Sequence, residues 1–341
     1  MSDIRERILS IPKSEIHLHI EALASVETIW ALKKKHKIHF KDIETIEDLQ
    51  TAFKVTSLEA FLNVFINIIQ VSFQEEEDLK YLIEDTKNYL VRNNIWYAEI
   101  FFAPSKLIRN GLSFEKMAKI LDDGAKRIYK EKNITVKYII DVSRTFGAEN
   151  AMQNLDLTLK YIKPSFIGIG LGGSETNGPA VNFKEVFKKA IDNNLKVVAH
   201  AGEDVGPESI WSAIKDLGAQ RIGHGISAIQ DKKLLKYLQT NNVPLEVCPT
   251  SNFFTRKYCK DYSDHPIREL YDSGVMVTVN TDDPSIFGVE LVEEYARLYD
   301  NKVFSEEEII TLIKNNLYAT FLSKELKDEI WGNIKKELSL K

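Results

Sequence analysis

The chain has 341 residues, a length that suits either two average domains or one large α/β barrel. Its 44% apolar and 28% charged residues are typical of a globular protein, and a net charge of −5 argues against a general nucleic-acid binder. The polar start MSDIRERILSIPKSE is unlike a signal peptide, no apolar run approaches a membrane span, and two cysteines are too few for a disulfide scaffold, so a cytoplasmic location is expected.

The first predicted strand, Ser14–Ile20 (SEIHLHI), alternates apolar side chains with imidazoles. Residues i and i+2 share one face of a strand, so His17 and His19 are expected to point the same way. Helices are predicted next at Val26–Lys35, after the N-cap residue Ser57, and from Glu75 onward. We interpret residues 57–92 as a helical insertion between the first and second strands.

Apolar runs of strand length then alternate with helical patterns. The runs are Ile95–Phe102, Val136–Val142, Phe166–Leu171, Leu195–Ala199, Arg221–Gly223, Pro244–Val247 and Val275–Val279. The helical patterns between them are Ser113–Lys130, Asn150–Tyr161, Phe183–Asp192, Glu208–Leu217, Asp231–Gln239 and Pro266–Tyr271. With the first strand, this alternation predicts eight parallel strands closed into a (β/α)8 TIM barrel. No linker or repeat interrupts the chain, so residues 1–341 are predicted to form one domain.

The stretch Lys196–Trp211 (KVVAHAGEDVGPESIW) indicates what the strand ends carry. A short apolar run leads to His200 and then to Glu203, and Pro207 begins the next helix. In barrels of this kind, chemistry is carried at the carboxyl ends of the strands. The other predicted ends hold His17 and His19, Gly172-Gly173, His224, Ser251-Asn252 and Asp282-Asp283.

Three neutral imidazoles and one carboxylate form a plausible ligand shell for a single Zn²⁺. The candidate ligands are His17, His19, His200 and Asp282. Such a shell leaves one position open, and a water bound there drops in pKa from about 15.7 to near 7. His224 is placed to orient or deprotonate that water, and Glu203 to shuttle a proton. The fourth strand ends without a lysine, so no carbamylated lysine is available to bridge a second metal.

Each of these features has a structural interpretation when it is taken alone. A histidine pair on one strand face is more often packed than metal-binding, His224 between two glycines fits a tight turn, and Asp282-Asp283-Pro284 fits another. Their coincidence at the ends of one predicted barrel favours the metal site. Three further histidines are assigned no chemistry: His36 and His39, expected to be solvent-exposed, and His265, expected at a helix entry.

Six motifs follow one another along nearly the whole chain. They are PKSEIHLH (12–19), LGGSE (171–175), HAGE with GPES (200–209), RIGHG (221–225), CPTSN (248–252) and NTDDP (280–284). In content and order they resemble the adenosine deaminase family of zinc aminohydrolases. The resemblance implies a (β/α)8 barrel of purine metabolism that holds one zinc ion and removes the 6-amino group of a purine as ammonia.

The resemblance also implies a role for each residue at the strand ends. The family's zinc ligands correspond to His17, His19, His200 and Asp282. Glu203 corresponds to the acid that protonates purine N1, and His224 to the histidine beside the metal-bound water. The backbone N–H of Gly173 would donate to N3, and Asp283 would face N7 with its carboxyl protonated, because N7 only accepts.

The departures from the family pattern bear on the substrate. Adenosine deaminases usually carry His-x-His-x-Asp-Gly, whereas this chain has Glu21-Ala22 after His19, and the Glu resembles adenine deaminases. Those enzymes usually have Asp where this chain has Gly223. The LGGSE segment, and EVCPTSN followed by Thr255-Arg256, are similar to the branch that deaminates 6-amino-6-deoxyfutalosine, a 5′-extended adenosine analogue of menaquinone biosynthesis. The expected partner is therefore a small purine nucleoside, either adenosine or this analogue, with adenine third; the oligomeric state stays open.

Non-enzymatic and nucleic-acid alternatives are disfavoured by particular features. A catalytically silent nucleoside-binding barrel would be expected to have lost a metal ligand or the N1 acid, and none is lost. A secreted growth factor related to the deaminases would be expected to carry a signal peptide and an extra N-terminal domain. A nucleic-acid deaminase would carry the H-x-E…P-C-x-x-C zinc signature, which this sequence lacks.

Overall fold

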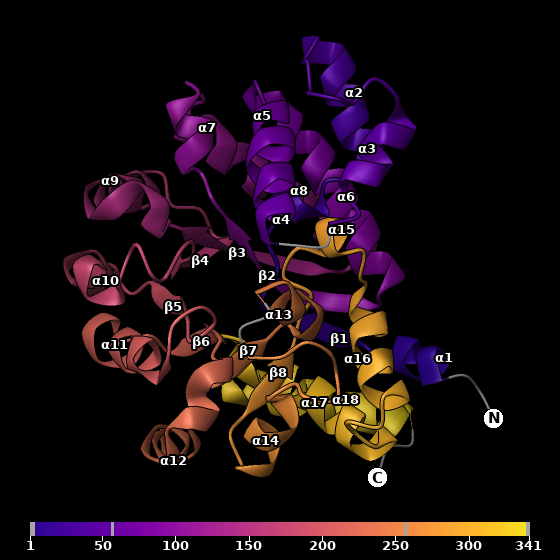
Figure 1. The fold of residues 1–341 in the computed structure, drawn as a ribbon, viewed down its shortest axis with the longest axis vertical. Helices are drawn as coiled ribbons and strands as arrows, with labels where there is room; N and C mark the ends of the chain where they lie inside the picture. Colours follow the sequence, from indigo (N-terminus) through magenta and orange to yellow (C-terminus); the bar gives the residue numbers. More distant parts are fainter. Residues whose placement is uncertain (1–3, 56–57, 256–257, 339–341) are drawn as a thin grey trace.

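The computed structural model describes residues 4–55, 58–255 and 258–338 and shows eight parallel strands surrounded by helices (Figure 1). The strands neighbour one another in chain order, from β1 to β8. They are β1 Lys13–Glu15, β2 Ile95–Phe102, β3 Thr135–Asp141, β4 Phe166–Leu171, β5 Lys196–Ala201, β6 Arg221–His224, β7 Leu245–Val247 and β8 Val277–Val279. The predicted (β/α)8 barrel is therefore confirmed.

The barrel closes between β1 and β8 through backbone bonds just beyond the two regular strands. Leu18 forms a parallel bridge with Asp282, whose N–H donates to the carbonyl of His17 at 3.2 Å. The N–H of His19 donates to the carbonyl of Asp282 at 3.0 Å. The residues that close the barrel are thus the same ones that the sequence predicts as metal ligands, and closure places their side chains at one end of it.

The first strand is shorter than predicted. Its regular part ends at Glu15, and His19 continues only as an isolated bridge to Phe101 of β2. The backbone beyond Glu15 bonds alternately to β2 and to Asp282, so no uninterrupted ladder forms. The alternation itself holds: the rings of His17 and His19 lie together, with centroids 5.7 Å apart.

The connection between β1 and β2 is helical, and it is longer than the predicted insertion at residues 57–92. Its helices are η1 Glu21–Leu23, α2 Val26–His36, α3 Ile46–Ala52, α4 Leu58–Val64, the π-helix η2 Phe65–Ile69, α5 Gln70–Ser72, η3 Glu76–Asp78 and α6 Leu79–Arg92. In Figure 1 these indigo and purple helices occupy the top of the view. The predicted N-cap Ser57 lies outside the described residues.

Helix α1 (Ile4–Ser10) precedes β1, and the remaining helices follow the later strands. They are α7 Ser105–Arg109, α8 Phe114–Lys132, η4 Arg144–Phe146, α9 Gly147–Lys160, η5 Ala180–Phe183, α10 Lys184–Asp192, α11 Pro207–Leu217, η6 Ile226–Gln230, α12 Lys232–Asn241, α13 Pro249–Thr255, α14 Ile267–Asp272, α15 Pro284–Phe287, α16 Leu291–Asp300, α17 Glu306–Ala319 and α18 Lys324–Glu337. Our sequence prediction contains no element after residue 279, so the last helices are an addition. Within the described ranges, no helix has the length and apolar character needed to cross a membrane.

Helix α17 secures the seam between the first and last strands. The side chain of Asn316 accepts from the N–H of Val279 at 2.9 Å and donates to its carbonyl at 2.7 Å. It also donates to the carbonyl of Ser14 in β1 at 3.3 Å. One buried amide therefore satisfies backbone groups of both strands, which have no regular ladder to pair them at this point.

Candidate metal and purine site

The four predicted metal ligands converge at the carboxyl end of the barrel. One ligand atom from each of them lies within 4.8 Å of the others, and all four residues are buried: His17, His19, His200 and Asp282. Oδ1 of Asp282 is 3.4 Å from Nε2 of His17 and 3.3 Å from Nε2 of His19. The ring of His19 stacks on Phe101, with centroids 5.1 Å apart.

The donor set fits a divalent metal ion. Nε2 of His17 and Oδ1 of Asp282 are buried without a hydrogen-bond partner among the described residues, a costly arrangement unless another group satisfies them. Burial, together with the neighbouring imidazoles, lowers the pKa of His200 well below its usual value, so this ring is neutral as a ligand must be. Three imidazoles and one carboxylate are the donors that Zn²⁺ prefers.

Metal uptake is expected to release protons at pH 7. Burial opposes the charging of His17 and His19, but their bonds to Asp282 prevail and raise the pKa of His17 to about 9 and of His19 to about 10. Both rings therefore carry an extra proton in the metal-free protein at pH 7, and each must lose it to bind the metal. Apparent zinc affinity should rise with pH until about pH 9–10. Titration calorimetry in buffers of different ionisation enthalpy measures this release; a heat independent of the buffer would contradict it.

A series of buried ion pairs orients the ring of His17 through its Nδ1 atom. Its Nδ1 lies 2.8 Å from Oε2 of Glu246 in β7, and Oε1 of Glu246 lies 2.6 Å from Nε of Arg221 in β6. The guanidinium of Arg221 also pairs with Glu99 of β2 at 2.5 Å and stacks over the ring of Phe321. These partners could not be identified from the sequence, because Glu246 and Arg221 lie on neighbouring strands whose register only the structure gives, and Glu99 lies across the barrel in β2.

Replacing Glu246 by glutamine should weaken zinc binding about 10- to 100-fold, because a carboxylate behind a ligating histidine fixes its ring orientation and raises its basicity. Thermal stability should also fall, since Arg221 would retain only Glu99 as a charged partner. Competition with a chelating dye measures the zinc affinity. Glu269→Gln, on the exposed side of α14, is the matched control. Equal zinc affinity in the two variants would contradict the prediction.

The loop that carries Glu203 is held by a second carboxylate, Glu175. Its oxygens accept from the backbone N–H groups of Gly202 and Glu203 at 2.8 Å and of Asp204 at 3.0 Å, and from the hydroxyl of Ser209 at 2.5 Å. From the sequence, Glu175 is predicted only as part of the LGGSE motif. Its position as the acceptor for three successive amides explains why the segment Gly202–Asp204 takes one conformation.

Glu203 is itself suited to hold a proton. Its Oε2 lies 3.3 Å from Nε2 of His224. Burial, reinforced by the nearby carboxylate of Asp282, raises the pKa of Glu203 well above its usual value. The close contacts of Asp282 with the rings of His17 and His19 hold its pKa well below its usual value despite its burial. The site therefore combines one ionised and one neutral carboxyl group.

Asp283 is a second neutral carboxyl. It is buried, its Oδ1 has no hydrogen-bond partner among the described residues, and burial next to Asp282 raises its pKa well above the usual value. Asp282 and His224 both adopt a positive φ, 64° and 60°, which is unusual for residues other than glycine and is common at functional sites. The hydroxyl of Ser251 donates to Oδ2 of Asp282 at 2.7 Å.

Glu21 and Gly173, the other predicted contacts, lie in the segments that follow β1 and β4. Glu21 begins η1, which packs against α15 and the π-helix η2. One of its oxygens accepts from the N–H of Ala103 at 2.8 Å, the other is buried without a partner in the described ranges, and burial raises its pKa to about 7. Gly173 has φ +91°, a conformation that favours glycine.

Gly223 leaves no room for a side chain beside the metal ligands. A Cβ at this position would lie 2.8 Å from Cε1 of His17 and 3.2 Å from Cα of His200. An aspartate here would therefore have to displace the ring of His17. The glycine that this chain has in place of the aspartate usual in adenine deaminases is therefore required by the close packing around residue 223.

One of the three histidines without assigned chemistry differs from its prediction. His39 is exposed as predicted, with 79% of its side chain accessible, and His265 lies at the entry to α14. His36 was predicted to be exposed, which is wrong: its Nε2 lies 2.8 Å from Asp78, whose other oxygen contacts Lys35 at 2.6 Å. The ammonium of Lys35 also contacts Glu75 and thus pairs with both carboxylates beside His36.

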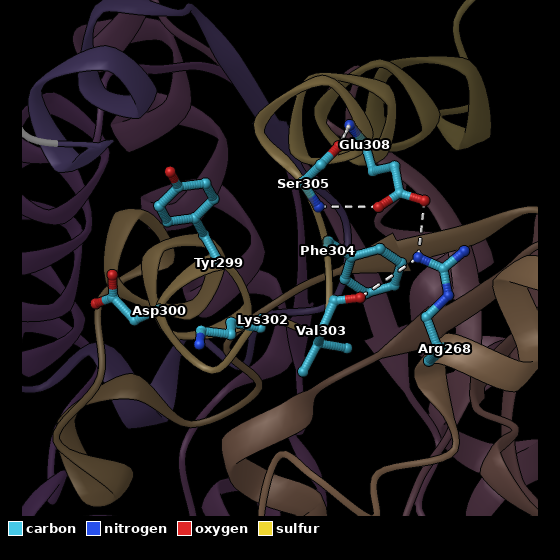
Figure 2. Close-up of a pocket in the computed structure, with 8 residues that line it drawn as sticks. All are labelled: Arg268, Tyr299, Asp300, Lys302, Val303, Phe304, Ser305 and Glu308. Atoms are coloured by element: carbon cyan, nitrogen blue, oxygen red, sulfur yellow. Dashed lines mark hydrogen bonds and ion pairs between the residues drawn. The ribbon is translucent and has the colours of Figure 1, made fainter.

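A hollow of about 630 Å³ lies apart from the strand ends, between α14, α16 and α17 (Figure 2). It contains none of the predicted site residues. Figure 2 shows the guanidinium of Arg268 bonded to Glu308 and to the carbonyl of Val303, and Arg268 also pairs with Asp272. The positive charge of Arg268 is thus already paired with two carboxylates.

The chain is similar in sequence and fold to known deaminases. The sequence model described as adenosine deaminase matches residues 12–337. The chain is 34% identical to the aminodeoxyfutalosine deaminase of Streptomyces avermitilis, covering 97% of this chain and 92% of that protein, and 35% identical to the adenosine deaminase of Shewanella loihica, covering 95% and 98%. The solved adenine deaminase of Arthrobacter aurescens superposes with a TM-score of 0.88 at 28% identity, covering 97% of this chain and all of that one.

Proposed function

The chain belongs to the adenosine deaminase family of hydrolytic deaminases, and on that premise we propose that it converts a 6-aminopurine nucleoside to its 6-oxo form and ammonia, in the manner of adenosine to inosine. One observation carries the proposal: four buried metal-ligand side chains converge beside two carboxyl groups whose pKa values are raised. Neutral carboxyl groups are what a purine needs as hydrogen-bond donors. A catalytically silent barrel would have no need to keep both halves of this arrangement.

The metal would be a single zinc ion, held by His17, His19, His200 and Asp282. When bound there, it supplies a water acidic enough to act as a nucleophile near neutral pH. The other residues of the site prepare the purine for that attack. We propose that their roles follow from their protonation states.

Glu203 would protonate N1 of the purine, which withdraws electrons from C6 and lowers the barrier to attack there. Asp283 would donate to N7, and the backbone N–H of Gly173 to N3, so three donors fix the ring. The raised pKa values of Glu203 and Asp283 support these roles, since an ionised carboxylate could not donate. His224 would hold the attacking water in line with C6.

The group attached at N9 is the open part of the proposal. The relatives include adenosine, adenine and aminodeoxyfutalosine deaminases at comparable identity, so similarity alone selects none of them. We propose a nucleoside, with 6-amino-6-deoxyfutalosine as the alternative to adenosine and adenine third. Gly223 supports placing adenine third, because the aspartate that resembles adenine deaminases would have to displace the ring of His17 at this position. We also keep the cytoplasmic location as a prediction.

The test is a direct comparison of substrates with the zinc-loaded protein. The ultraviolet change of 6-amino to 6-oxo conversion is followed for adenosine, 6-amino-6-deoxyfutalosine and adenine, and kcat/KM is compared. The highest value for adenosine would indicate purine salvage, with Glu21 acting in place of the usual aspartate. A preference of several orders of magnitude for the 5′-extended substrate would indicate menaquinone biosynthesis. No turnover of any of the three would refute the proposal.

A further inference from the structure

One buried histidine has no part in the roles described so far. His265 immediately precedes Pro266 at the entry to α14, is 4% exposed, and packs edge-on against the ring of Phe253. It is not one of the proposed metal ligands, yet its side chain bonds to Asn252, which in turn bonds to His224. A chain of three side chains thus connects α14 to the reacting centre.

The direction of the hydrogen bonds in this chain can be derived from its outer end. The backbone N–H of Ile267 donates to Nδ1 of His265 at 3.0 Å, and an amide N–H can only donate. Burial lowers the pKa of His265 to about 3, so the ring is neutral and has a single N–H. Since Nδ1 accepts, that proton is on Nε2.

The orientation of Asn252 follows. Nε2 of His265 lies 3.3 Å from Oδ1 of Asn252, so the ring donates and the amide oxygen accepts. The amide nitrogen then faces the other way, 3.1 Å from Nδ1 of His224. An amide NH₂ group can only donate, so Nδ1 of His224 must accept and cannot carry a proton.

The neutral ring of His224 therefore has its proton on Nε2. That atom faces the site, 3.3 Å from Oε2 of Glu203 and 3.9 Å from Oδ2 of Asp282. A nitrogen that already holds a proton donates a hydrogen bond and is unavailable to take one. Of the two roles that the sequence leaves open for His224, orienting the water or deprotonating it, the chain from α14 favours the first.

We propose that His265 is a positioning residue, which acts through Asn252 to hold His224 in the tautomer that presents Nε2–H to the reacting centre. His224 then directs the attacking water by donating to its oxygen. The catalytic consequence rests on the proposed function, whereas the tautomer itself does not. The signal in the sequence is weak, since a histidine before a proline is normally assigned only to a helix entry.

The first test measures the tautomer by nuclear magnetic resonance in zinc-loaded protein labelled with ¹⁵N-histidine. Two-bond ¹H–¹⁵N correlations report which ring nitrogen of His224 carries the proton, and the signal is assigned by its loss in His224→Asn. The native protein should show Nε2–H alone. His265→Leu, which removes the donor, should give a mixture of tautomers, and His265→Gln, which keeps an N–H able to reach Asn252, should restore Nε2–H. His39→Gln, at an exposed site, is the control.

The second test measures the kinetics of the two His265 variants, and Asn252→Asp tests the same hydrogen bonds without altering His265. His265→Leu should lower kcat about 10- to 100-fold with KM and zinc content unchanged, and His265→Gln should recover most of the loss. If His265→Leu fails to fold, Asn252→Asp tests the same chain, because its carboxylate oxygen would accept from Nδ1 of His224 and invert the tautomer.

Three results would overturn the proposal. They are Nε2–H alone in both His265→Leu and Asn252→Asp, equal kcat losses in the leucine and glutamine variants, or a kcat loss that matches the loss of zinc. The tautomer is measured without substrate, so this measurement tests the positioning role of His265 separately from the proposed deaminase function. The expected tautomers in a protein that deaminates no purine would refute the proposed function but would still support the positioning role of His265.

Discussion

Glu203→Gln is expected to lower kcat about 100- to 10,000-fold while zinc content stays at the native level. The amide keeps the shape of the side chain but has no acidic proton to give to purine N1. Glu203 has this proton near neutral pH because burial and the carboxylate of Asp282 raise its pKa. Its backbone N–H would still be held by Glu175, so the loop should keep its conformation.

Turnover is also expected to depend on pH through Glu203. The active form has Glu203 protonated, so kcat/KM should fall as the pH rises through the raised pKa of this group, and Glu203→Gln should lose that alkaline limb. Steady-state kinetics and elemental analysis measure both effects, with Glu185→Gln on the exposed face of α10 as the control. Near-native turnover in Glu203→Gln would exclude Glu203 as the acid.

His200→Ala is expected to remove most of the zinc and, with it, nearly all turnover. The alanine leaves two imidazoles and one carboxylate, and it opens a space next to the ring of His17, whose centroid lies 4.5 Å from that of His200. The stabilisation that zinc confers on the folded protein should fall in parallel, because a ligand stabilises only in proportion to its binding. Arg144, which donates to the carbonyl of His200, should keep the end of β5 in place.

Elemental analysis of zinc per chain is the primary measurement, supported by the shift in Tm between zinc-loaded and chelator-treated protein. His39→Ala serves as the matched control, since His39 is exposed and lies outside the site. Full zinc occupancy in His200→Ala would refute the ligand set. Retained zinc together with lost turnover would give His200 a role in the reaction without metal binding, which contradicts the prediction as well.

The parts of the fold that could be predicted are those encoded by short-range patterns. Alternation in SEIHLHI puts two imidazoles on one face, and apolar runs of strand length separated by amphipathic stretches specify eight β–α units. Parallel strands end at a common edge, so the residues after each run could be grouped without coordinates. This reasoning located His17, His200, Glu203 and Asp282 because each lies at or just beyond such an end.

Other features depended on distances between residues far apart in the chain. Arg221 pairs with Glu246 because β6 and β7 are neighbours in a particular register, and with Glu99 because the barrel places β2 across from β6. Closure by backbone bonds between His17, His19 and Asp282 shortened β1 relative to its pattern. The local sequence around each of these residues is compatible with many partners, so no periodicity could have indicated them.

The protonation states most clearly separate what the sequence predicts from what depends on the tertiary structure. Residue types alone predict that the site contains acids and imidazoles, but not which of them hold protons. Burial near the carboxylate of Asp282 raises the pKa values of Glu203 and Asp283, while close contacts with His17 and His19 keep that of Asp282 low. The tautomer of His224 depends on a backbone N–H at Ile267, on the far side of Asn252 and His265. Sequence thus specified which groups reach the strand ends, and the tertiary structure decided their charge and the direction of their hydrogen bonds, because both depend on neighbours that only folding supplies.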